Sequence, residues 1–197
     1  MSYLKEFQSA ASRTKRLGLG DVSLSETAVA IDQTILNLLE ESCPTPFAGR
    51  AGAVLNVNFG MFHMLSKKLH IPGAVLTFGN VAAGGVDRYP ADAPLFRRMV
   101  EEESGEENLG RYHVWTTLPG GVIIDHAVMS SLAHDGLVEV DDAVPSERFV
   151  YGPADALEFE LSYRPLVLGH GFLVASGTID PEAMDYLMGS RFPKQYD

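Results

Sequence analysis

The chain has 197 residues, of which 46% are hydrophobic and 21% are charged. These values are typical of a folded globular protein and exclude wholesale disorder. It has 15 Lys and Arg residues and 26 Asp and Glu residues, so the formal net charge is −11. We therefore expect no nucleic-acid partner, because phosphate recognition draws on clustered Lys and Arg.

The length predicts a single α+β domain over residues 1–197, with residues 1–22 as an N-terminal arm. The first 20 residues have no long apolar run, so we expect no secretory signal there, and no apolar run in the sequence reaches the roughly 18 residues of a membrane-crossing helix. We therefore expect no membrane insertion. Cys43 is the only cysteine, which excludes an intramolecular disulfide and fits a reducing, cytoplasmic compartment.

The first half of the sequence reads as helical. A short helix is expected in the first 20 residues, and a stronger one from near Ser23. There, Ser23 and Glu26 have capping-box spacing, and apolar residues follow at helical intervals up to Leu39. The prolines at 44 and 46 should end this helix. A second helix is expected over about residues 47–69, with a stop at His70-Ile71-Pro72-Gly73.

The pattern then changes. Residues 74–85 predict a strand with a glycine-rich exit, and residues 87–109 an exposed loop with a short helix. Residues 112–118 and 122–126 predict a β-hairpin around Pro119-Gly120-Gly121, and further strands are expected at 148–151 and 157–168. Asp180 should cap a C-terminal helix. Helices followed by strands favour an α+β fold with an antiparallel sheet.

Three residues carry a possible chemistry: Cys43, His113 and Asp125. A free thiol is mostly protonated at neutral pH, and only the thiolate is a strong nucleophile. An imidazole can take the thiol proton, and a carboxylate on its other nitrogen fixes the tautomer. Cys43 precedes a predicted helix, whose dipole favours a thiolate. These residues therefore predict a Cys-His-Asp triad.

The hairpin register decides whether His113 and Asp125 can meet. With a three-residue loop, Leu118 pairs with Val122, and His113 and Asp125 become diagonal neighbours on one face. With a two-residue loop, Asp125 points to the other face. The triad therefore requires the three-residue loop or an equivalent bulge.

The hairpin resembles one in a known family. His113-Val114-Trp115 followed by Gly120 to Asp125 is similar to the His-x-Trp and Gly-x-x-x-x-Asp hairpin of transglutaminase-like proteins, within the papain-like Cys-His-Asp superfamily. Leu69-His70-Ile71-Pro72-Gly73-Ala74-Val75 is similar to that family's Leu-Gly-Ile-Pro-Ala-Arg-Val segment. The resemblance covers residues 43–128. It implies a papain-like core, in which a long central helix packs on an antiparallel sheet and carries the nucleophile at its N-terminus.

The position of the nucleophile departs from this family. Cys43 lies farther before Ile71 than the family cysteine does, and the family position falls near Ala51, Ala53 or Val54. Arg50 to Val54, followed by Asn58, also resembles the Arg-Gly-Gly-x-Cys motif of arylamine acetyltransferases, with Val54 in place of the cysteine. Either Cys43 still reaches His113, or the nucleophile is absent.

Two further residues are candidates for substrate binding. Trp115 is read either as core or as the wall of a pocket, and Asn58 as a source of amide contacts or as a residue bonding its own backbone. The histidines have no paired spacing typical of a metal site, and no phosphate-binding glycine loop is present. We therefore expect neither metal nor cofactor.

The sequence thus favours a thiol-dependent acyltransferase or amide hydrolase acting on a small-molecule or peptide substrate. The alternative is a catalytically silent binding protein with the same fold, and either one could form a homo-oligomer.

Overall fold

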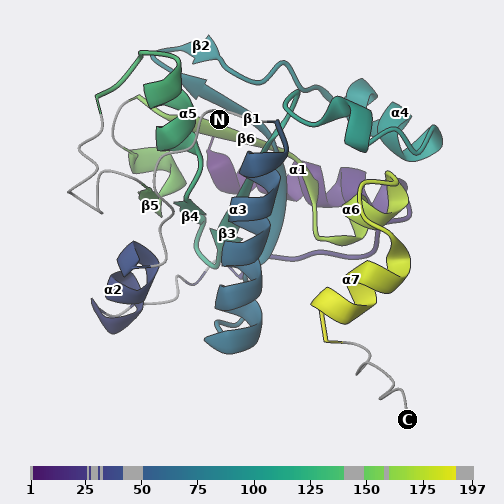
Figure 1. Cartoon of the computed structure of the whole chain (residues 1–197), viewed down its shortest axis with the longest axis horizontal. Coiled ribbons are helices and arrows are strands. Elements are labelled where there is room, and N and C mark those ends of the chain that lie inside the picture. Colours follow the sequence, from purple (N-terminus) through teal and green to yellow (C-terminus); the bar gives the residue numbers. More distant parts are fainter. Residues whose placement is uncertain are drawn as a thin grey trace.

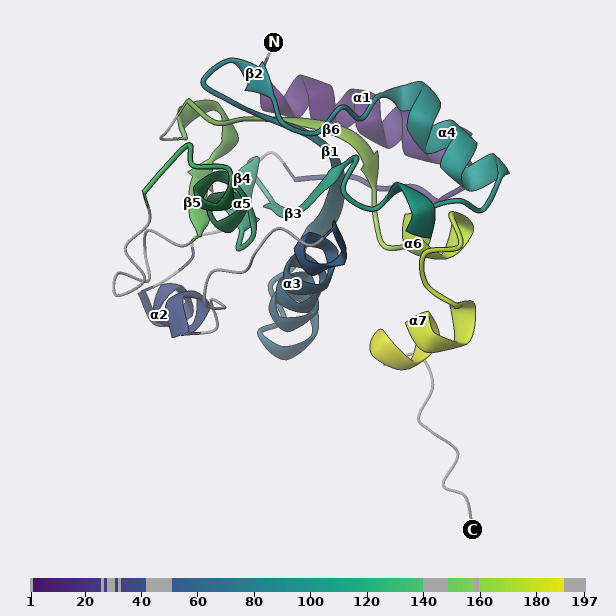
Figure 2. The ribbon, with the colours of Figure 1, turned by 45° about the horizontal axis from the view of Figure 1, so that its top comes forward.

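A computed structural model describes residues 2–25, 27, 31, 33–41, 51–139, 149–157 and 160–189. In this part of the chain the protein is a mixed α/β structure with helices around a curled antiparallel sheet (Figures 1 and 2). None of its described helices is both long and apolar enough to cross a membrane.

The sheet is built around its longest strand, β1. Residues 77–79 of β1 pair with both β3 and β6, so these two strands lie on opposite edges of β1. The order continues from β3 to β4 and β5, and β2 forms a short hairpin with the end of β1. The strands are β1 (Val75–Ala83), β2 (Val86–Asp87), β3 (His113–Leu118), β4 (Val122–Asp125), β5 (Val150–Pro153) and β6 (Ser162–Leu168).

Helices pack on both sides of this sheet and along one edge. They are α1 (Tyr3–Arg16), α2 (Gln33–Glu41), α3 (Ala51–His63), α4 (Ala93–Glu101), α5 (Val128–His134), α6 (Gly171–Ala175) and α7 (Pro181–Leu187). A π-helical turn, Met64–Lys68, continues α3, and 3-10 turns lie at Glu106–Asn108 and Ala154–Ala156.

The two sides of the sheet contribute to separate parts of the core. Successive side chains of a strand point to opposite faces. On one face Trp115 and Tyr163 pack with residues of α1 and α5. On the other face Phe78 and Val114 pack with residues of α3, α4 and α6. A buried side chain of this size contributes about 1.5–3 kcal/mol, so both clusters hold the sheet in place.

Helix α1 covers the outer edge of β6. That edge would otherwise present unpaired backbone groups to other chains. Instead, the Arg13 guanidinium donates to the Leu166 carbonyl oxygen at 2.7 Å, and the Leu168 N–H donates to Thr14 Oγ1 at 3.0 Å. Thr14 is fully buried. Side chains of α1 therefore take the place of a neighbouring strand.

The prediction of a helix beginning near Ser23 is wrong. Residues 21–25 are not helical, and the described helix α2 begins only at Gln33. Val22 and Leu24 pack against the core, and the Ser25 carbonyl oxygen accepts a hydrogen bond from Gly120 N–H at 2.8 Å. Tertiary contacts thus outweigh the local capping pattern, whose second residue, Glu26, lies outside the described residues.

Other expectations are confirmed. The second predicted helix corresponds from Ala51 onward to α3 and its π-helical turn, and it ends where His70 adopts a left-handed backbone with φ of 50°. Its predicted start at residues 47–50 lies outside the described residues. The strand after it is β1, and Asp180 caps α7 by accepting hydrogen bonds from Glu182 and Ala183 N–H. Helix α6 was not predicted from the sequence.

We expect the Thr14→Val substitution to lower the free energy of unfolding by about 1–3 kcal/mol, because it leaves the buried Leu168 N–H without an acceptor. Urea unfolding followed by circular dichroism measures the change. Ser12→Ala is the matched control, since exposed Ser12 bonds only within its own helix, to the Gln8 carbonyl oxygen. Equal stability of Thr14→Val and the wild-type protein would contradict this role for Thr14.

Candidate functional site

The β3–β4 hairpin has the register that the triad hypothesis requires. Leu118 pairs with Val122 and Thr116 with Ile124, so the loop has three residues, as predicted. Gly120 and Gly121 both adopt positive φ, of 77° and 76°, which residues with a Cβ rarely do. The glycines therefore fix the loop that brings His113 and Asp125 to one face.

Asn58 of α3 is inserted where this hairpin opens. Hydrogen-bonded pairs in an antiparallel ladder recur every two residues along each strand. After Thr116 and Ile124, the next such pair would join Val114 to His126. Instead, Asn58 Nδ2 donates to the Val114 carbonyl oxygen at 2.7 Å, and Asn58 Oδ1 accepts from His126 N–H at 3.0 Å. The side-chain amide thus replaces a backbone pair of the sheet.

The same amide also holds the Asp125 carboxylate. Asn58 Nδ2 donates to Asp125 Oδ1 at 2.9 Å, and the N–H groups of Ala127 and Val128 donate to this oxygen at 2.9 and 3.1 Å. Asp125 is fully buried. Three donors on one oxygen compensate for much of the hydration that the carboxylate loses.

The other carboxylate oxygen binds two side chains. Asp125 Oδ2 lies 2.5 Å from His113 Nε2, and the Tyr163 hydroxyl donates to it at 2.8 Å. Burial alone would raise the pKa of Asp125, but the charge and hydrogen bond of His113, with the bonds from Ala127 and Asn58, hold it below the usual value. Burial first, and then the Asp125 charge, raise the pKa of Tyr163 well above 10, so its hydroxyl stays a donor.

His113 is enclosed by aromatic rings. Its side chain is fully buried, and its ring centroid lies 4.6 Å from that of Tyr89, with Trp115 and Tyr163 farther out at 6.3 and 6.4 Å. The Nδ1 atom is buried and has no hydrogen-bond partner in the described structure. In the neutral imidazole whose proton is on Nε2 and directed at Asp125, Nδ1 carries a lone pair that can accept a proton.

The structure brings two of the three predicted triad residues together. His113 and Asp125 form the pair described above, whereas Cys43 lies outside the described residues. The chemical roles assigned to all three stay predictions.

The two predicted substrate-binding residues both lie in the interior. Trp115 is fully buried, and its indole N–H donates to the Tyr3 hydroxyl at 2.9 Å and to Thr117 Oγ1 at 3.1 Å. Asn58 is also fully buried, and its amide bonds β3, Asp125 and His126. These contacts give both residues a place in the framework of the site, and their contact with a substrate stays a prediction.

Sequence reasoning did not select Tyr89 or Tyr163. Tyr163 lies 38 residues after Asp125 and reaches it from β6. The only sequence signal was that Tyr163 falls in the alternating segment 158–163, which predicted a strand but no partner for its hydroxyl. Tyr89 follows β2 in a segment predicted as an exposed loop, although it is buried.

No group of three or more His, Cys, Asp or Glu residues that could hold a metal ion occurs among the described residues. Comparisons with other proteins do not indicate a function for this site. No protein-family model, curated protein or solved structure matches this chain.

His126 connects this site to α2. Its Nε2 donates to the Leu39 carbonyl oxygen at 3.0 Å, and its ring stacks on Phe149 with centroids 4.8 Å apart. Burial lowers the pKa of His126 below 6.5, only partly offset by the Leu39 bond and the Asp125 charge. The imidazole is therefore kept neutral in the folded protein.

We expect Asn58→Ala to reduce the free energy of unfolding by roughly 2–5 kcal/mol, because it leaves Val114, His126 and Asp125 each short of a buried hydrogen bond. Chemical denaturation measures this loss. Asn56→Ala on the same helix is the control: Asn56 is exposed, and we expect a change within about 0.5 kcal/mol. A loss of similar size in both variants would contradict the role assigned to the inserted amide.

Acid should destabilise the protein partly through His126. Because its pKa is lower in the folded state than in the unfolded state, the stability it contributes is complete above about pH 6.5 and is lost as the pH falls below that value. We expect His126→Gln to flatten the fall in unfolding free energy between about pH 7 and 5.

Exposed His134, changed to Gln, is the control for this experiment and should leave the pH dependence unaltered. His170, whose pKa burial also lowers, retains its share of the dependence in both variants. An unchanged slope in His126→Gln would contradict the assignment.

Proposed function

We propose that this protein catalyses thiol-dependent acyl transfer or amide hydrolysis, with Cys43 as nucleophile, His113 as general base and Asp125 as the residue that orients the imidazole. The observation that carries the proposal is the His113–Asp125 pair, in which one imidazole nitrogen is bound to a fully partnered carboxylate and the other has no partner among the described residues. This is the arrangement that activation of a nucleophile requires.

The sequence keeps Cys43 close to a residue that is bonded beside Asp125. The Leu39 carbonyl oxygen is bonded to His126, the residue after Asp125. Cys43 follows Leu39 by four residues, which span at most about 14 Å when fully extended. This short connection supports Cys43 as the thiol that would act with the His113–Asp125 pair.

The chemistry would proceed in two steps. The Cys43 thiol proton passes to His113 Nδ1 while the sulfur attacks the carbonyl carbon of the substrate. The tetrahedral intermediate then collapses, the imidazolium returns the proton to the leaving amine or alkoxide, and a thioester remains on Cys43. Attack on the thioester by water gives hydrolysis, and attack by an acceptor amine or alcohol gives transfer. Either attack regenerates the thiol.

The scaffold we propose for this chemistry is papain-like and transglutaminase-like. Helix α3, extended by its π-helical turn, packs on β3 and joins the hairpin through Asn58. We assign this helix the place of the central helix in that superfamily. The substrate would be a small molecule or a peptide, and no cofactor would be required.

Thiol labelling tests the proposal. We expect iodoacetamide to label Cys43 with a pH midpoint well below 8.5, because a neighbouring imidazolium stabilises the thiolate. His113→Gln should move that midpoint up to about 8.5 and slow labelling at neutral pH roughly tenfold or more. Mass spectrometry follows the rate, and His134→Gln, at an exposed position, is the matched control. A midpoint that is the same in the wild-type protein and His113→Gln would refute the triad.

A second candidate is a catalytically silent binding protein. Val54 is 7% exposed and precedes Asn58 by one helical turn, on the same side of α3. The resemblance to the arylamine acetyltransferase motif aligns Val54 with the cysteine of that motif, which is the nucleophile. If Val54 has replaced the nucleophile, Cys43 labels at the ordinary rate of a free thiol, or barely at all, and Val54→Cys introduces a thiol whose labelling depends on His113.

A further inference from the structure

A groove of about 630 Å³ lies between α1 and α4, and Figure 2 shows α4 alongside the C-terminal half of α1. The volume of this α1–α4 groove falls within the range of about 300–1,000 Å³ that is usual for small-molecule sites. Leu17, directly after α1, and Ala93 and Val100 of α4 give it apolar surface, and all three are half-buried. Leu17 and Val100 also pack against the core, so this surface is held in place.

Three arginines line the same groove: Arg13 and Arg16 of α1 and Arg97 of α4. A guanidinium has five N–H donors. Arg13 uses Nη1 to bond the Leu166 carbonyl oxygen, and Arg97 uses Nε to bond Glu101. The Arg16 side chain has no partner among the described residues. Most of the guanidinium donors around the groove are therefore available to a ligand.

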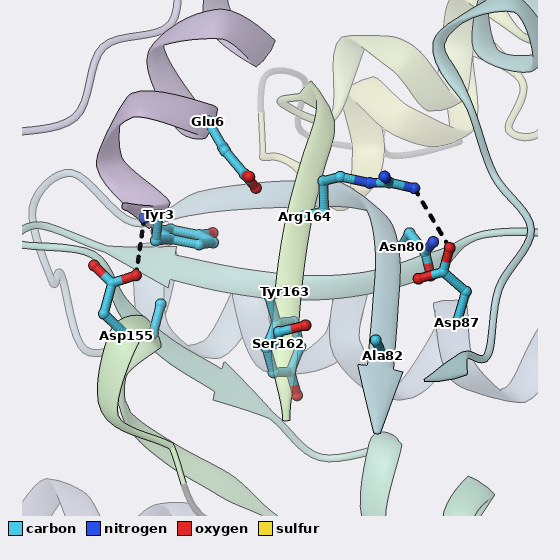
Figure 3. A pocket seen from close by; sticks show the side chains of 10 residues that line it. Tyr3, Glu6, Asn80, Ala82, Asp87, Asp155, Ser162, Tyr163 and Arg164 are labelled. Carbon is cyan, nitrogen blue, oxygen red and sulfur yellow. Dashed lines mark hydrogen bonds and ion pairs between the residues drawn. The ribbon is translucent and has the colours of Figure 1, made fainter. Parts of the chain in front are cut away.

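The charge of the groove is opposite to that of the whole chain. Glu101 is the single carboxylate beside its three arginines, although the chain carries a net charge of −11. The cavity that Tyr163 of the candidate site lines is different, because there Arg164 faces Asp87 at 3.8 Å (Figure 3). The α1–α4 groove thus has an excess of positive charge that an anion would neutralise.

Arg13 and Arg16 lie three residues apart in the last turn of α1, so their side chains are neighbours on the helix. Burial first, and then the Arg16 charge, lower the pKa of Arg13. The C-terminal end of a helix favours basic residues, which accounts for where the two arginines lie but supplies neither with a counter-ion. A carboxylate bound in the groove would offset their repulsion.

We infer that the α1–α4 groove binds an aliphatic carboxylate, whose oxygens accept hydrogen bonds from the arginines and whose chain lies on the apolar surface. The planar guanidinium matches the two oxygens of a carboxylate. The apolar residues beside the arginines favour an anion with a hydrocarbon chain over an inorganic anion. The net charge of −11 opposes docking of the whole protein on an anionic membrane, so we expect a single dissolved ligand.

Sodium octanoate serves as the probe. We expect it to bind the wild-type protein in titration calorimetry and to raise the midpoint temperature of unfolding. Hexanoate has two fewer CH₂ groups and should bind about four- to fifteenfold more weakly, depending on how fully the chain is buried. 1-Octanol keeps the chain and lacks the charge, and it should bind at least about tenfold more weakly, the effect of losing charge-assisted hydrogen bonds.

Three substitutions on exposed residues test the assignment of the arginines. Arg16→Gln and Arg97→Gln should each weaken octanoate binding about tenfold, and both variants should fold because neither side chain is buried. Glu101→Gln should instead strengthen binding about threefold, because it removes the single carboxylate of the groove and releases Arg97. Arg98→Gln is the matched control on α4: Arg98 is exposed, does not line the groove and should leave the affinity unchanged.

The absence of detectable heat and thermal shift with octanoate would overturn the inference. So would equal affinities of octanoate for the wild-type protein, Arg16→Gln and Arg97→Gln, or equal affinities of octanoate and 1-octanol for the wild-type protein. Binding to phosphatidylglycerol vesicles without binding of octanoate would overturn it in favour of a membrane surface. None of these results bears on Cys43 labelling, because no described contact joins a residue of the groove to His113 or Asp125.

Discussion

The ionised carboxylate of Asp125 is the constraint that organises this structure. A carboxylate away from water is tolerated only when its oxygens accept hydrogen bonds from surrounding donors. Here the donors come from α3, β3, β6 and the turn into α5. Four segments, of which α3 and β6 are distant in sequence from Asp125, must therefore come together before the charge is stable. A shift of any of them leaves the carboxylate short of a partner.

This arrangement favours positional precision over maximum stability. An apolar residue in place of a buried charge is often neutral or stabilising, so a buried ion pair is weak evidence of a purely structural role. The inserted Asn58 amide also indicates a role beyond stability. A backbone pair could close the β3–β4 ladder without any side chain from α3. Opening the ladder and filling it from a helix sets the distance between α3 and the His113 ring. Such control is useful where a helix must present a group to an imidazole.

Local features of the sequence were sufficient wherever short-range chemistry decides the conformation. The hairpin register follows from Gly120 and Gly121, and the start of α7 from the side chain of Asp180. Near Ser23 the same kind of reasoning failed, because the backbone there bonds to Gly120 rather than to a helix of its own.

The contacts of the candidate site also differ in how far they could be predicted from the sequence. The pairing of His113 with Asp125 could be predicted from the sequence because a single hairpin joins them. The polarity of Asn58 within an apolar helix was visible, but its partners on β3 and after β4 are more than 50 residues away. Tyr163 belongs to another strand entirely, and only the folded sheet brings it to Asp125. The periodicity of a sequence predicts which side of a helix or strand is buried, but it does not predict which residues that side contacts.

The protection of β6 by α1 has a consequence for the solution behaviour of the protein. Arg13 and Thr14 occupy the backbone groups with which a strand of another molecule would otherwise pair. Detachment of this helix would uncover a ready template for intermolecular β-pairing next to an apolar core. We therefore expect the docking of the first helix to oppose strand pairing between molecules.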